Sequence, residues 1–142
     1  MKKFKKYRPI QVRWNEALGE KECPYAYRWV FNFYFFAIRI HHFLRSEPIK
    51  HQHDHAWDFV TFILKGGYID VSPDGVDKLR AGFIRYRKAE HIHNVVLSKG
   101  KGCWTLLLTF RPRRKWGFWV NGKLKRPLKY FHKFGHSPCS EQ

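Results

Sequence analysis

Histidines are the residues of this sequence best suited to chemistry, and their spacing matters more than their number. His51, His53 and His55 alternate with other residues, and His91 and His93 repeat this spacing further along the chain. Side chains two positions apart on a β-strand share one face. Two such pairs on neighbouring strands would converge, and imidazole is a common ligand of divalent transition metals. We therefore predict a metal site at which histidines of these two clusters converge.

The same run of histidines has a second interpretation. His-Gln-His-Asp-His at residues 51–55 is also a composition expected of an exposed loop that binds stray metal weakly. However, a run rich in apolar residues follows directly and includes Trp57, Phe59, Val60, Phe62, Ile63 and Leu64. Such a run predicts a buried strand that begins at the histidines, which favours the metal site over the surface loop.

The elements that would position these histidines have the composition of short strands. Runs rich in aromatic and β-branched residues are bounded by turn residues. We expect two strands within residues 25–44, broken near Asn32–Tyr34, and others at 51–64, 68–71, 82–87, 92–97 and 104–109. Asn121-Gly122 predicts a closing hairpin. One short helix is expected at residues 15–21 or 127–134. This pattern predicts an all-β sandwich or barrel.

The chain as a whole has the length and composition of one folded domain. It has 142 residues, of which 44% are hydrophobic, which excludes a disordered basic tail. We divide it into a basic arm (1–8), a β-barrel domain (9–133) and a flexible tail (134–142). No run approaches the roughly 18 apolar residues that a membrane helix needs, and no secretory signal is recognised.

The cysteines add an expectation about the compartment. Cys23, Cys103 and Cys139 are an odd and widely spaced set with no Cys-x-x-Cys motif. They argue against a disulfide framework and a thiolate zinc site, and for a reducing environment. We therefore expect a cytoplasmic protein that does not contact a membrane.

These motifs resemble those of the cupin superfamily. The first cupin motif is Gly-x5-His-x-His-x(3,4)-Glu-x6-Gly, and His53, His55 and Gly66 match its histidine pair and closing glycine. In the second motif, Gly-x5-Pro-x-Gly-x2-His-x3-Asn, Gly82 is followed at the expected interval by His93. A narrower resemblance, to a group of bacterial and phage cupin-like proteins, rests on residues 53–59, 66–68, 89–93 and 116–119.

The resemblance implies a small, jelly-roll-like cupin barrel that binds one divalent metal ion through His53, His55 and His93. The sequence also departs from the motifs. The glutamate of the first motif would fall at Phe59 or Val60, so neither position supplies it. Asp58 is one residue away and would face inward only at a bulge. The proline, glycine and asparagine of the second motif are replaced by Lys88, Glu90 and Leu97. The site is then either a three-histidine site or two histidines with a carboxylate from elsewhere, for iron, zinc, nickel, copper or manganese.

The charge of the chain points to a second kind of partner. Lys and Arg number 28 against 11 acidic residues, a formal net charge of +17, which attracts polyanions. Residues 111–119 interleave cations with aromatic rings, as in surfaces that bind phosphates and stack bases. The candidates there are Arg111, Arg113, Arg114, Lys115 and Trp116. A basic loop whose tryptophans cap the barrel is the alternative.

We hypothesise a metal-dependent enzyme, of the dioxygenase or isomerase type, acting on a small anionic metabolite. Asp58, Glu90 and His91 are its candidate general bases or hydrogen-bond partners of the metal ligands. The alternatives are a non-catalytic module that binds nucleic acid or nucleotides and, third, a structural phage component. A homodimer is left open.

Overall fold

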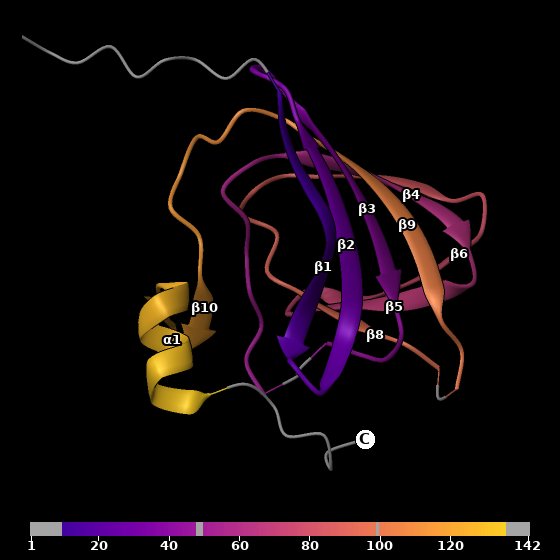
Figure 1. Cartoon of the computed structure of the whole chain (residues 1–142). Coiled ribbons are helices and arrows are strands. Elements are labelled where there is room, and N and C mark those ends of the chain that lie inside the picture. The colour runs from indigo at the N-terminus through magenta and orange to yellow at the C-terminus, as the bar shows by residue number, and fades with distance from the viewer. Residues whose placement is uncertain (1–9, 48–49, 99, 136–142) are drawn as a thin grey trace, which may run out of the picture.

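The computed structural model describes residues 10–47, 50–98 and 100–135, and nearly all of its regular structure is β-strand (Figure 1). The all-β class is therefore confirmed. The expected arm at residues 1–8 and most of the expected tail, 136–142, lie outside the described residues.

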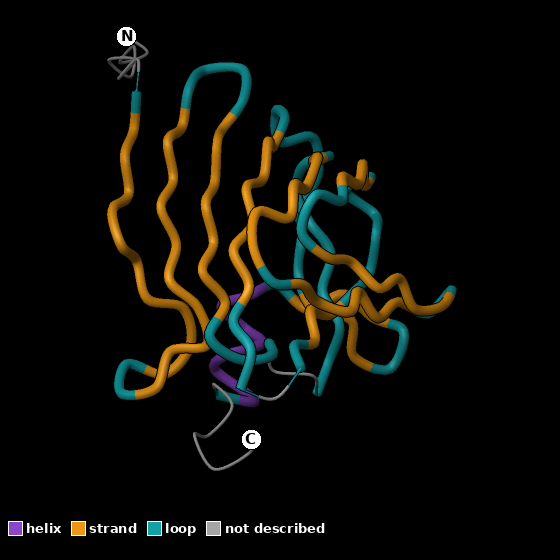
Figure 2. The backbone as a smooth tube through the Cα atoms, turned by 90° about the vertical axis from the view of Figure 1, so that its right-hand side faces the viewer, coloured by secondary structure: helices purple, strands orange, loops and turns teal. Residues whose placement is uncertain are grey.

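The largest layer is a six-stranded antiparallel sheet. Its strands, in spatial order, are β1 (Gln11–Glu20), β2 (Cys23–Asn32), β3 (Ala37–Phe43), β9 (Cys103–Thr109), β4 (Phe59–Lys65) and β7 (Ile84–Arg87). Figure 2 shows the long strands β1, β2 and β3 side by side. Burial alternates strictly along β9, so every second side chain of this strand faces the interior.

A second, smaller sheet packs across the large one. It consists of β6 (Gly75–Arg80), β5 (Gly67–Ser72) and β8 (Asn94–Val96). Apolar side chains of both sheets form the core between them, among them Phe43, Ile63, Tyr68, Leu79 and Val95. The sheets face each other without closing into one continuous barrel, so the expected barrel is an open β-sandwich.

The C-terminal part closes one side of the sandwich. Strands β10 (Phe118–Val120) and β11 (Lys123–Lys125) form the expected hairpin, and Asn121 and Gly122 both have positive φ, as a type I′ turn requires. Helix α1 (Pro127–Phe134) follows, with Pro127 in its first turn. Tyr130 of α1 stacks on Phe118 with ring centroids 4.0 Å apart, which fixes the helix against β10.

The helix lies at one of its two expected positions, Pro127–Phe134, whereas residues 15–20 belong to β1. Two expectations are corrected. The segment 51–58 is not part of a regular strand, since β4 begins only at Phe59. Cys23 takes part in a disulfide, whereas Cys103 is buried and free, so the cysteines no longer argue for a reducing compartment. Within the described residues no helix is long and apolar enough to cross a bilayer.

Candidate metal centre

Backbone pairing brings the histidines together although their segment is not a regular strand. His53 and His93 exchange two backbone hydrogen bonds, His53 N to His93 O at 3.1 Å and His93 N to His53 O at 2.9 Å. The His55 N–H donates to the carbonyl of Ala89 at 3.0 Å. On the other side, the Trp119 N–H donates to the carbonyl of Gln52 at 2.9 Å. The first histidine segment therefore lies between the second one and β10.

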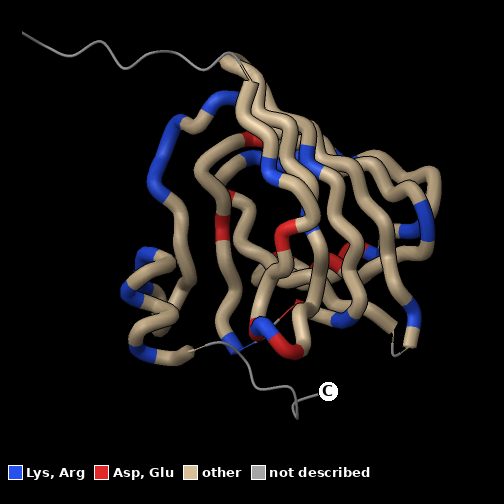
Figure 3. The backbone as a smooth tube through the Cα atoms, in the orientation of Figure 1, with Lys and Arg blue, Asp and Glu red and all other residues tan. Residues whose placement is uncertain are grey.

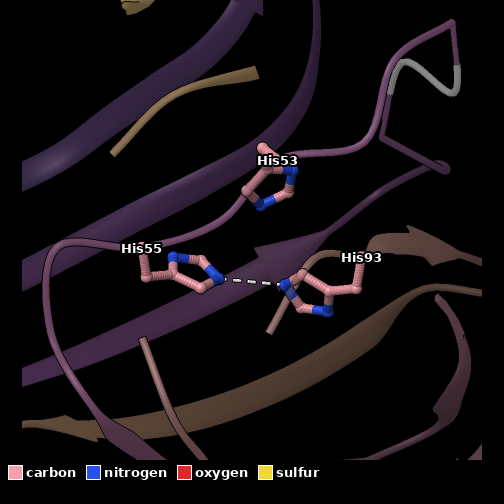
Figure 4. Close-up of side chains that lie close together, drawn as sticks. All are labelled: His53, His55 and His93. Carbon is pink, nitrogen blue, oxygen red and sulfur yellow. Dashed lines mark hydrogen bonds between the residues drawn. The ribbon is translucent and has the colours of Figure 1, made fainter. Parts of the chain in front are cut away.

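The side chains of His53, His55 and His93 converge (Figure 4). One ring nitrogen of each lies within 4.8 Å of the others. The closest pair is His55 Nε2 and His93 Nε2, which are 2.9 Å apart. Two imidazole nitrogens that bind one ion at about 2.0–2.1 Å and at a right angle are themselves about 3 Å apart. The spacing of this pair therefore fits two neighbouring positions on one transition metal ion.

A buried carboxylate orients His93. Asp70 on β5 is 3% exposed, and its Oδ2 lies 2.9 Å from His93 Nδ1. If Nδ1 carries the proton, Nε2 has its lone pair free toward the other histidines. The second oxygen of Asp70 lies 2.9 Å from His91 Nε2. His91 thus contacts the carboxylate that holds His93.

Burial keeps two of the three imidazoles neutral. Removal from water lowers the pKa of His53, and it lowers the pKa of His55 well below the ordinary 6.5 of histidine. The neutral imidazole is the form that binds a metal ion. For Asp70, burial raises the pKa, but the hydrogen bonds from His91 and His93 outweigh it, and the net pKa is far below the usual range. Asp70 therefore stays ionised as their acceptor.

The three histidines open onto a cavity of about 660 Å³ inside the sandwich. Trp57 and Phe59 line it beside His55, with ring centroids 4.8 and 4.7 Å from the imidazole. Among the described residues, Glu47 is the one acidic side chain that lines the cavity. Its Oε2 lies 4.0 Å from His53 Nδ1. A metal ion held here would face space in which a small molecule fits.

Asp58 and Glu90 lie elsewhere. Both carboxylates bind the guanidinium of Arg113, at 2.7 Å for Asp58 and 2.6 Å for Glu90. Asp58 also accepts the Ala89 N–H at 2.8 Å, and these bonds hold its pKa below the usual range. No hydrogen bond joins either carboxylate to the three histidines within the part of the chain that the structure describes. Their assignment as bases thus has no contact to support it, whereas His91 contacts Asp70.

The basic loop at residues 111–117 is tied to the sandwich. Arg114 Nη1 donates to the fully buried Asp54 at 2.7 Å. Arg113 is paired with Asp58 and Glu90. Arg111 lies over the Tyr34 ring, and Trp116 lines the cavity near Phe118. Lys115 is exposed. Two of the four predicted anion-binding cations therefore already have carboxylate partners.

Three acidic residues near the histidines were not predicted from the sequence, namely Asp70, Asp54 and Glu47. Asp70 had a usable signal, because it is a lone acid between Ile69 and Val71 in an apolar strand. Asp54 had none, because its partners lie far away along the chain, and Glu47 had none, because no motif relates it to His53.

Comparison with known proteins identifies the fold. The sequence matches no family model and no curated protein sequence. A cupin domain protein of Bordetella pertussis Tohama I is similar in structure at 18% identity, with a TM-score of 0.52 over 62% of this chain and 95% of that one. Fe(II) HppE matches at 13% identity with a TM-score of 0.57, over 71% of this chain and 56% of that chain. The DMSP lyase DddQ of Ruegeria pomeroyi DSS-3 matches at 16% identity with a TM-score of 0.56, over 72% and 56%. The fold is thus a cupin fold, as the motifs predicted.

Proposed function

We propose that this cupin-fold chain binds one divalent transition metal ion through His53, His55 and His93, and that it is an enzyme acting on a small anionic substrate. The observation that carries the proposal is the 2.9 Å separation of His55 Nε2 and His93 Nε2, since it fits neighbouring positions on one ion. A metal bound by three protein ligands keeps open positions, where it supplies Lewis-acid or redox chemistry of the isomerase or dioxygenase type.

The residues around the histidines support this assignment. Asp70 holds the His93 ring by its Nδ1, the kind of partner that metal-binding histidines usually have. The rings of Trp57 and Phe59 pack against His55 and exclude water from that side. Glu47 lines the same cavity and is its candidate proton acceptor, whereas Asp58 and Glu90 do not line it.

The structural neighbours are compatible with such chemistry. One of them, HppE, was solved with Fe(II), and another is named as a DMSP lyase. The low identities restrict this comparison to the fold, so the assignment rests on the histidines of this chain.

Elemental analysis of protein purified without a histidine tag tests the proposal. After reconstitution with iron(II), zinc, nickel, copper or manganese, we expect close to one ion per chain, lost on chelation. His53→Ala, His55→Ala and His93→Ala should each remove most of it, because each deletes one ligand. His132→Ala, on the exposed side of α1, is the matched control and should retain it. Equal losses in all four variants, or metal far below one per folded chain, would overturn the proposal.

A further inference from the structure

We infer that the cavity contains a separate anion subsite, formed by Arg39 and Arg28 on the large sheet, which binds the carboxylate or phosphate group of a small organic ligand. The inference deepens the proposed function, because it names the chemical class of its substrate. Its relevance to a reaction rests on that function, but the subsite itself does not require the metal.

Arg39 is a half-buried cation without a carboxylate partner. Its side chain points inward from β3, and its Cζ lies 4.8 Å from the centre of the Trp57 ring. Its Nε donates to Thr109 Oγ1 at 3.3 Å, and no other hydrogen bond to the guanidinium occurs within residues 10–47, 50–98 and 100–135. Burial, and then the charges of Arg28 and Arg13, lower its pKa to about 10, so it remains charged at neutral pH. The two terminal nitrogens are left to face a ligand.

The charge around Arg39 is unbalanced. Arg28 donates to Glu16 Oε2 at 2.6 Å, and Arg13 lies 3.6 Å from the other oxygen of the same carboxylate. One acid thus serves two arginines, while Arg39 has none. All three arginines line the cavity. A guanidinium in a partly dry cavity favours a bidentate oxyanion, because the planar donor fork matches carboxylate and phosphate.

Two buried polar atoms beside the arginines also lack partners. Arg28 on β2, His41 on β3 and Thr105 on β9 are in register across the sheet. Thr105 is fully buried and His41 is 9% exposed, and both line the cavity. His41 Nδ1 and Thr105 Oγ1 have no hydrogen-bond partner in the described structure. Buried polar groups are rarely left unpaired in native proteins, so these two atoms indicate a polar ligand in the cavity.

The subsite lies close to the histidines. The Trp57 ring contacts Arg39 on the one hand and stacks on His55 on the other, with ring centroids 4.8 Å apart and planes 18° apart. A molecule anchored by its acidic group at Arg39 therefore needs only a short body to reach the metal ligands. The geometry points to a small organic acid or phosphate ester and not to a polymer.

Calorimetry on the chelated, metal-free protein tests the subsite with succinate, inorganic phosphate and, as the neutral isostere, succinamide. We expect one anion to bind per chain, succinamide not to bind, and the stronger anion to identify carboxylate or phosphate as the natural group. Arg39→Gln should weaken binding at least ten-fold. Arg80→Gln, at an exposed arginine on β6, is the matched control and should leave it unchanged.

Two results would overturn the inference: neither anion binding, or equal losses in the Arg39 and Arg80 variants. If Arg39→Gln fails to fold, Arg39→Lys replaces it, and its loss of the planar fork should still weaken binding several-fold. Because metal is absent from this experiment, a failed anion site leaves the metal stoichiometry standing. A failed metal site likewise leaves the anion result standing.

Discussion

Buried imidazoles decide how this protein responds to acid, and His41 is the clearest case. It is 9% exposed, and burial, followed by the charges of Arg28 and Arg39, lowers its pKa from 6.5 to about 3. Between about pH 3 and pH 6.5, the imidazole is therefore neutral in the folded chain and protonated in the unfolded chain. The favourable contribution is therefore present above about pH 6.5 and is lost progressively as the pH falls toward 3.

His41→Gln should weaken that pH dependence. The wild-type free energy of unfolding should fall more steeply than that of the variant, by up to about 1.4 kcal/mol per pH unit below pH 6.5, because one proton is linked to unfolding. Urea denaturation of the metal-free proteins at about pH 7, 6 and 5 measures the difference. His53 and His55 act in the same direction in both proteins and cancel. Parallel pH profiles would show that His41 is protonated in the folded state.

At the scale of single residues, the sequence predicted the histidines better than their surroundings. Period-two spacing placed His53, His55 and His93 together, because an extended segment alternates its side chains even where it is not a regular strand. Asp70 could be singled out as a lone acid in an apolar strand, but neither its histidine partners nor the role of Arg39 could be predicted from spacing. Each acts through contacts with residues distant in sequence, which depend on strand order and register, and local spacing does not report either.

At the scale of elements, one buried carboxylate holds the histidine segment to the basic loop and β10. Asp54 is fully buried and lies between His53 and His55 in the sequence. It accepts hydrogen bonds from Arg114 Nη1 at 2.7 Å, Gly117 N at 2.9 Å and Trp119 Nε1 at 3.0 Å. A single side chain thus fixes three points of residues 114–119, which close the cavity beside Trp116.

Asp54→Ala should therefore be strongly destabilising. The change leaves two N–H groups without their acceptor and removes the carboxylate partner of Arg114, which retains the carbonyls of His55 and Ala89. The expected loss is about 3–5 kcal/mol in the free energy of unfolding. Chemical denaturation measures it. Glu90→Ala is the matched control, because it also removes an arginine partner, but at an exposed pair whose loss should change stability little. A comparable small effect of both changes would mean that water replaces Asp54.

Strands were predictable from the sequence where the turn between them has a recognisable local sequence. Asn121-Gly122 and Ser72-Pro73-Asp74-Gly75 both lie at hairpin turns, since these residues tolerate the backbone angles that such turns need. Strand β1 was missed because it is an exposed edge strand. Asn15 has a positive φ at a register shift between Arg13 and Glu16, which interrupts the alternation of side chains.

At the scale of the whole molecule, the net charge of +17 still has to be explained. Basic residues are spread over the sandwich and are frequent on the loop before β10 and on α1 (Figure 3). In that loop, Arg113 and Arg114 are engaged with Asp58, Glu90 and Asp54. Trp116 lies half-buried at the cavity, with its ring 6.2 Å from that of Phe118. The loop is thus built mainly as internal structure.

Binding to single-stranded nucleic acid should accordingly be diffuse and sensitive to salt. Contacts with phosphates release counterions, and the logarithm of the affinity falls by roughly 0.7 per contacted phosphate for each decade of salt. We expect binding to vanish by about 0.15 M salt, where the Debye length is about 8 Å. Trp116→Ala should not alter it, because a half-buried ring is not free to stack on a base. Fluorescence anisotropy across a salt series, with Lys123→Ala as a control for the general charge, measures both effects.

A complex that survives at this salt and loses roughly 1–3 kcal/mol of binding free energy with Trp116→Ala would instead show that bases stack on this ring. In that case a nucleic-acid-binding module would replace the metal-dependent enzyme as the proposed function.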